Sequence, residues 1–124
     1  MALHHRNSKD IVINRLGFKT GIQIIGGVQR LLHYAKQNYN KIITWSDNRW
    51  STGKIYEKAG FVMEKNMNAD YSYFDNKKVY RIPTQSMQKK KIGCPDHMTE
   101  HEFTLSKGIY RIYDCGKKRW VFTK

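Results

Sequence analysis

Acidic residues are scarce in this sequence. Ten Asp and Glu stand against 23 Lys and Arg in 124 residues, which gives a formal net charge of +13. The few carboxylates are scattered, so neither a carboxylate pair nor a Ser/His/Asp arrangement for catalysis stands out. The surplus of cations favours binding of polyanions, because such binding releases condensed counterions.

Cysteine, proline and long apolar runs are also scarce. Two cysteines cannot build a disulfide scaffold. The longest apolar stretch, GIQIIGGVQ, is too short to cross a bilayer, and the polar start MALHHRNSKD lacks the apolar core of a secretory signal. We therefore expect a soluble, cytoplasmic protein without a membrane partner.

What the chain does contain is typical of a folded domain. Apolar residues make up 40% of the sequence and aromatic residues 13%, and the length suits one domain. Alternating and helical periodicity predicts strands at 10–18 and 42–45, a further strand that starts at Phe61, and helices at 28–40 and 51–59. Asp47 or Ser51 is the expected cap of the second helix, and Gly60 its end.

The remainder of the chain has weaker patterns. A tyrosine-rich hairpin is expected at 71–82. The spacing of Thr99 and Glu102 predicts a capping box on a helix that ends at Gly108, and a second hairpin turns at 114–117. His4 and His5 are expected in a disordered end. The predicted fold is α+β: a core at 1–82, a basic linker at 83–95 and a helix–hairpin tail at 96–124, forming one compact unit.

A glycine-rich loop precedes the first long helix. Gln23, Gly26, Gly27 and Val28 lie where a strand leads into a helix, and bare amide groups at a helix start can bind phosphate. The alternative is that the glycines only allow the helix to pack closely on the sheet.

This loop resembles the pyrophosphate loop of GNAT-family acetyltransferases, Gln/Arg-x-x-Gly-x-Gly/Ala, although Val28 stands where the family has Gly or Ala. The segment NRWSTGKIYEKAGF is similar to the closing segment of that family, but Asn48 lies one residue too far upstream. The resemblance implies a truncated GNAT-like sheet, a coenzyme A site at Gln23, Gly26, Gly27 and Val28, and Tyr56 as general acid if the chain transfers acetyl groups.

Four segments together resemble a narrower family. They are VINRLGFKTGIQIIGGVQRLLHYA, IITWSDNRWSTGKIYEKAGF, ADYSYFDNKKVYRI and TEHEFTLSKGIYRIYDCGKKRWVF, and they resemble the C-terminal region of Hef-like homing endonucleases of large bacteriophages. The resemblance implies a phage-encoded accessory module acting in the host cytoplasm, with the nuclease residues of the family outside this sequence.

Basic residues interleaved with aromatic residues are typical of nucleic-acid-binding surfaces. Tyr71, Tyr73, Trp50 and Trp120 are candidates for stacking on bases of DNA or RNA. The alternative is that the cations lie on solvated turns and the aromatic rings form the core. The candidate contacts to nucleic acid are Arg49, Trp50, Lys54, Lys77, Lys78, Arg81, Lys89, Lys90, Lys91, Lys117, Lys118 and Arg119.

The spacing Cys94-x2-His97-x3-His101-x13-Cys115 offers four possible zinc ligands, although their order is not that of a standard zinc finger. Ordinary cysteines and exposed histidines are the alternative reading.

Taken together, these patterns predict a non-catalytic DNA-binding module without a cofactor. Two alternatives remain. One is a phage protein that blocks a host defence complex, and the other is an acetyl-CoA-dependent transferase completed by formation of a homodimer.

Overall fold

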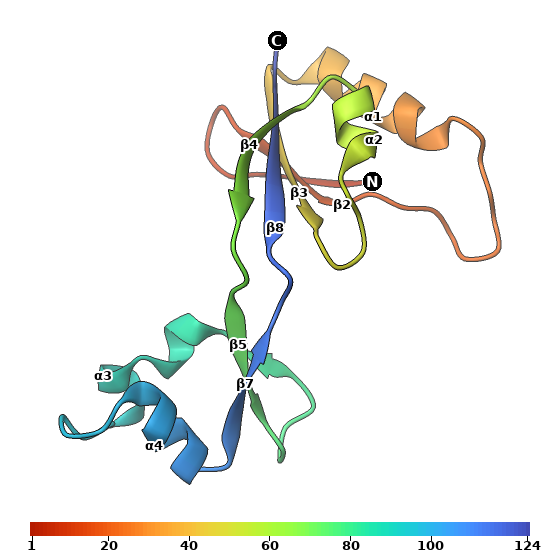
Figure 1. The fold of residues 1–124 in the computed structure, drawn as a ribbon. Helices are drawn as coiled ribbons and strands as arrows, with labels where there is room; N and C mark the ends of the chain where they lie inside the picture. The colour runs from red at the N-terminus through yellow and green to blue at the C-terminus, as the bar shows by residue number, and fades with distance from the viewer. The chain divides into compact units, whose positions relative to one another are not determined.

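The computed structural model describes all 124 residues and has the predicted α+β class (Figure 1). The chain forms two compact units. Unit 1 comprises residues 1–68 and 116–124, and unit 2 comprises residues 69–115. No helix has the length and apolar character needed to cross a membrane.

Unit 1 is built on a five-stranded sheet in the order β1-β2-β3-β8-β4. Strands β2 and β3 are parallel, and the other neighbours are antiparallel. The strands span Ala2–His5 (β1), Ile11–Arg15 (β2), Lys41–Asp47 (β3), Val62–Met67 (β4) and Lys117–Thr123 (β8).

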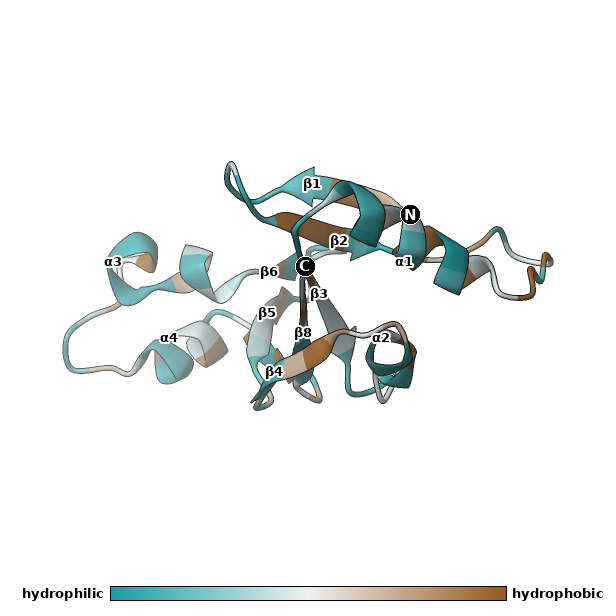
Figure 2. Cartoon of the chain, turned by 90° about the horizontal axis from the view of Figure 1, so that it is seen from above, coloured by the Kyte–Doolittle hydropathy of each residue, from teal (hydrophilic) through white to brown (hydrophobic).

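Helix α1 (Gly27–Asn38) connects the two parallel strands, which need such a crossover. Leu32 and Ala35 of the predicted helical stripe are fully buried, and they pack with Ile42, Phe61 and Trp120 in one core. Figure 2 shows β2 as hydrophobic over its first part and hydrophilic at its end, and the arrowhead of the edge strand β1 as hydrophilic.

Helix α2 (Lys54–Lys58) is followed by Gly60 with a φ of 85°, so the predicted end of this helix is confirmed. The predicted cap is wrong, because the N-cap is Gly53 and no side chain caps the helix. Asp47 and Ser51 instead accept hydrogen bonds from the backbone of the connecting loop.

The N-terminal segment was expected to be disordered, and this expectation is wrong. His4 and His5 lie in β1, which pairs with β2 from Ala2 to His5. The backbone hydrogen bonds between β1 and β2 keep this polar segment in the sheet, although its side chains are not buried.

Unit 2 contains a three-stranded antiparallel sheet in the order β6-β5-β7. Its elements are β5 (Tyr71–Asp75), β6 (Arg81–Ile82), the 3-10 helix η1 (Thr84–Met87), α3 (Lys89–Ile92), α4 (Glu100–Ser106) and β7 (Ile109–Tyr113). Tyr73, Ile82 and Met87 form the core. The predicted capping box of Thr99 and Glu102 is present at the start of α4.

The expected linker at 83–95 is part of the folded unit 2. It forms η1 and α3, and Met87 is buried against Tyr73 and Ile82. The run of lysines lies on α3. The apolar residues on either side of this run, Met87 and Ile92, pack in the core of unit 2 and hold the segment in place.

The predicted C-terminal hairpin is wrong. β7 pairs with β5 in unit 2, whereas β8 pairs with β3 and β4 in unit 1. Trp120 on β8 is buried in the core of unit 1, and this burial requires β8 to lie between β3 and β4. The chain therefore divides at 68/69 and 115/116, in place of the expected boundaries at 82 and 95.

Candidate nucleic-acid interface

Positive charge is unevenly divided between the two units. Unit 1 holds 15 of the 23 lysines and arginines but only four of the ten acidic residues. Unit 2 holds eight basic and six acidic residues and is close to neutral. Because four carboxylates cannot neutralise fifteen cations, most of the surplus positive charge of the chain lies in unit 1.

The loop at residues 48–53, which connects β3 to α2, is fixed by hydrogen bonds at its start and end. Asp47 Oδ1 accepts from the amide of Arg49 at 2.9 Å. The carbonyl oxygen of Asp47 accepts from the amides of Trp50 and Ser51. Lys118 Nζ donates to the carbonyl oxygen of Thr52 at 3.2 Å. These bonds give the 48–53 loop one defined conformation.

Trp120 lies directly against the end of this loop. A Cβ on Gly53 would lie 2.3 Å from the Trp120 ring, and Gly53 has a φ of 79°, so this position requires glycine. The close approach of backbone to ring places the 48–53 loop on the core of unit 1.

The exposed part of the loop is a cation–aromatic pair. The Trp50 side chain is 76% exposed, and the Arg49 guanidinium lies 4.7 Å from the centroid of its ring. Lys54 follows at the exposed first residue of α2. An indole held beside several cations can contact sugars or bases while the cations contact phosphates.

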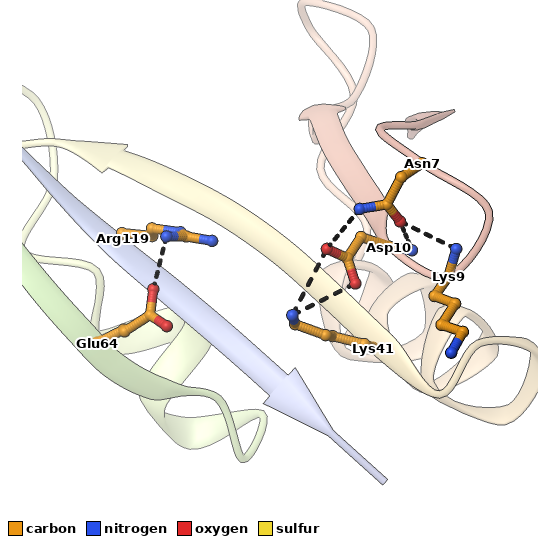
Figure 3. A network of polar contacts seen from close by, with 6 residues as sticks. All are labelled: Asn7, Lys9, Asp10, Lys41, Glu64 and Arg119. Atoms are coloured by element: carbon orange, nitrogen blue, oxygen red, sulfur yellow. Dashed lines mark hydrogen bonds and ion pairs between the residues drawn. The ribbon is translucent and has the colours of Figure 1, made fainter.

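The predicted cations of β8 have different surroundings. Lys118 joins the 48–53 loop through its bond to Thr52. Arg119 forms an ion pair with Glu64 at 2.9 Å (Figure 3), which offsets its charge. Lys117 lines a groove of about 370 Å³ with Trp45, Asp47 and Met67.

Unit 1 contains a second polar site that was not predicted from the sequence. Asp10 accepts from Asn7 Nδ2 at 3.1 Å and pairs with Lys41 Nζ at 3.3 Å (Figure 3). The hydrogen bond from Asn7 and the charge of Lys41 lower the pKa of the Asp10 carboxyl. Asp10 and Lys41, together with Lys9 and Lys124, line a groove of about 870 Å³. No sequence motif joins positions so far apart.

The predicted contacts in unit 2 belong to a nearly neutral body. Lys78 Nζ lies 5.8 Å from the ring centroid of Tyr80, and Lys77 and Arg81 are exposed beside it. In the other predicted group, Lys91 Nζ donates to the carbonyl of Gln85, Lys89 is half-buried and Lys90 is exposed. The structure therefore splits the twelve predicted residues between two separate units.

Two of the four aromatic residues expected to stack on bases are buried. Trp120 is 5% exposed and Tyr73 is 0% exposed, so their prediction as stacking residues is wrong. The Tyr73 hydroxyl donates to Glu100, and burial together with this bond raises the pKa of Tyr73 to about 12. Tyr71 is half-buried, with the Arg111 guanidinium 4.2 Å from its ring centroid.

The glycine loop has a structural role in packing. Gly26 is the N-cap of α1 with a φ of 70°, and a Cβ on Gly27 would lie 2.6 Å from the Phe18 ring. Val28 packs partly buried against the core, and Gln23 is exposed. Close approach of Phe18 is thus sufficient to explain Gly27.

Tyr56, the residue that the GNAT resemblance selects, is half-buried on α2. Its ring centroid lies 5.8 Å from that of Phe61 and 6.2 Å from that of Trp120. Tyr56 also lines a groove of about 650 Å³ together with residues 14–17 at the end of β2.

The possible zinc ligands are not assembled. No three His, Cys, Asp or Glu side chains lie together in a way that could hold a metal ion. Cys94 Sγ lies 3.6–3.7 Å from the carbonyl oxygens of Pro95, Met98 and Thr99, one of which can accept its single S–H hydrogen, and His97 and His101 are exposed.

No protein-family model and no curated protein sequence matches this chain. The resemblances to GNAT acetyltransferases and to Hef-like homing endonucleases therefore depend on the motifs of the chain itself. The physical case for an interface depends on the charge of unit 1 and on the 48–53 loop.

Proposed function

We propose that this chain is a non-catalytic DNA-binding module of a phage homing-endonuclease-like protein, and that unit 1 binds the duplex. The observation that carries the proposal is the concentration of positive charge in unit 1 beside the exposed Arg49–Trp50 pair. The four motif segments support its assignment to the Hef-like family.

The contacts would be mainly to the phosphate backbone. Arg49, Lys54 and Lys118 lie on or beside the 48–53 loop, where they can neutralise neighbouring phosphates. Trp50 adds a flat apolar surface for a sugar or a base edge. Since phosphate contacts carry no sequence information, the expected binding has little sequence preference.

Fluorescence anisotropy with a labelled duplex of about 20 base pairs tests this proposal. The affinity should fall steeply between about 50 and 200 mM salt, with a slope in log–log form of about −0.9 for each phosphate neutralised. The double variant Arg49→Ala, Trp50→Ala should bind at least about tenfold more weakly at each salt concentration, because it loses both a charge and an apolar contact surface.

Lys90→Ala in unit 2 is the matched control, since it also removes one exposed charge. Affinity that is independent of salt, or equal losses for the control and the double variant, would contradict the assignment of duplex binding to unit 1.

A second candidate, acyl-coenzyme A binding, is favoured by one observation: Tyr56 faces a groove at the end of β2. Acetyl-coenzyme A should then raise the thermal unfolding midpoint more than inorganic tripolyphosphate at equal concentration. Tyr56→Phe should keep this shift and lose acetyl transfer. Equal shifts of the unfolding midpoint with both anions would show that charge alone causes the stabilisation. This result would contradict acyl-coenzyme A binding.

A further inference from the structure

The sheet of unit 2 has one face covered by η1 and α3, and an opposite face on which Arg81 and Tyr110 are exposed and Phe74 is half-buried. Side chains alternate between the faces of a strand. Tyr73, Ile82 and Ile109 share the covered face, where they pack with Met87 of η1 and Ile92 of α3. Their strand neighbours lie on the opposite face, which we call the Phe74 face: Ser72, Phe74, Arg81, Tyr110 and Ile112.

Three residues of the Phe74 face form a row across the sheet. Phe74 on the central strand pairs directly with Arg81 of β6 and with Tyr110 of β7. Directly opposed residues have their Cβ atoms about 4.5–5.5 Å apart. The two aromatic rings and the guanidinium are therefore neighbours on one surface, and Tyr110 is 50% exposed.

The charges beside Arg81, at the end of the Phe74 face next to the β5–β6 turn, are positive, whereas Asp70 and Asp114 lie at the other end of β5 and β7. Arg81 belongs to the face, and Lys77 and Lys78 lie in the turn between β5 and β6. The nearest carboxylate in sequence, Asp75, projects to the opposite face, and its Oδ1 accepts from the amide of Lys77. An apolar protein partner would bury Arg81 at a cost, whereas a phosphate chain would neutralise it.

We propose that the Phe74 face binds single-stranded nucleic acid by stacking unpaired bases on Phe74 and Tyr110, while Arg81 contacts the phosphate backbone. Bases in a duplex are already stacked on each other, so a flat aromatic row favours an unpaired strand. This site uses no residue of unit 1 and does not depend on duplex binding there.

The test measures how much more tightly the whole chain binds a single strand with bases than a single strand without bases. The ratio of its affinity for oligothymidylate of about 12 nucleotides to its affinity for an abasic strand of equal length isolates stacking from charge. We expect a ratio of about ten for the natural sequence, and a clearly lower ratio for Tyr110→Ala, which loses one of the two stacking rings and keeps Phe74. Comparing the affinities for oligodeoxyuridylate and oligouridylate, which differ only in their sugar, shows whether the site prefers DNA or RNA.

Tyr113→Ala is the matched control. Tyr113 lies on the same strand and is 61% exposed, but it projects to the opposite face beside Tyr71. This variant should keep the ratio within about twofold, and Tyr110→Phe, which keeps the ring, should restore it.

Three outcomes would overturn the proposal: a ratio near one for the natural sequence, a ratio unchanged by Tyr110→Ala, or equal losses for Tyr110→Ala and Tyr113→Ala. If the Arg49→Ala, Trp50→Ala variant loses duplex binding but keeps the ratio of the two single-strand affinities, the result tests the proposal for unit 1 and leaves the Phe74 face unaffected. Failure of the two proposals is therefore distinguishable.

Discussion

The indole nitrogen of Trp120 donates a hydrogen bond to Ser46 Oγ at 2.9 Å, and both residues are buried in unit 1. The bond joins β8 to its neighbour β3, the central strand of the sheet. Gly53 lies against the part of the same indole that contains this nitrogen, so the bond fixes the ring on which the 48–53 loop lies. Stability of the core and placement of the candidate interface are therefore linked through one side chain.

Ser46→Ala should destabilise the protein by about 1–3 kcal/mol, because it leaves the Trp120 N–H buried without an acceptor. Urea unfolding followed by tryptophan fluorescence measures this loss. Ser8→Ala, at an exposed serine in the turn between β1 and β2, should change stability by less than about 0.5 kcal/mol. Equal effects of the two variants would show that the Trp120 bond contributes nothing specific.

Gly53→Ala should be more destabilising than a change at another glycine with positive φ. It combines an unfavourable backbone conformation, about 1–2 kcal/mol, with a clash against the Trp120 ring. Gly21→Ala has the first cost only, since a Cβ there meets nothing within 4 Å. We expect weaker duplex binding for Gly53→Ala and unchanged binding for Gly21→Ala, measured by anisotropy on folded samples.

Lys54→Glu should weaken duplex binding more than Lys90→Glu, although each variant changes the net charge equally. Lys54 lies beside the 48–53 loop of unit 1, and Lys90 lies on α3 of unit 2. An acidic residue in the first turn of a helix is favourable, so Lys54→Glu is not expected to unfold α2. Titration of both variants at one salt concentration checks the order, and the reverse order would place the duplex on unit 2.

The capping box of α4 should make stability depend on pH. The amide and side chain of Thr99 form hydrogen bonds with the Glu102 carboxylate and amide, and they lower the pKa of Glu102 below its ordinary value of 4.5. The stabilisation is therefore complete above the ordinary pKa and is lost as the pH falls through the lowered value.

Comparison with Glu102→Gln isolates this effect, because other titrating groups are shared. The natural sequence should have the higher thermal unfolding midpoint at about pH 7, and the two midpoints should converge at about pH 3. A constant difference across this range would mean that the Glu102 charge does not contribute to the cap.

Local patterns identified the parts of the fold that are stabilised locally. The apolar spacing around Leu32 and Ala35 fixed α1, the pair Thr99 and Glu102 fixed the start of α4, and Gly60 fixed the end of α2. The placement of β8 was not predictable in this way. Residues 109–123 have the pattern of a hairpin, but burial of Trp120 in unit 1 outweighs pairing of neighbouring strands.

The features of the candidate site also divide into those that the sequence predicts and those that depend on tertiary packing. The sequence alone determined the surplus of cations and the interleaving of aromatic and basic residues. Only the tertiary structure decided that most of the charge surplus lies in unit 1, that Tyr73 and Trp120 are buried and that Phe74 and Tyr110 share the face opposite Tyr73. The reason is that a strand pattern defines two alternating sets of side chains, whereas packing against helices chooses which set is buried.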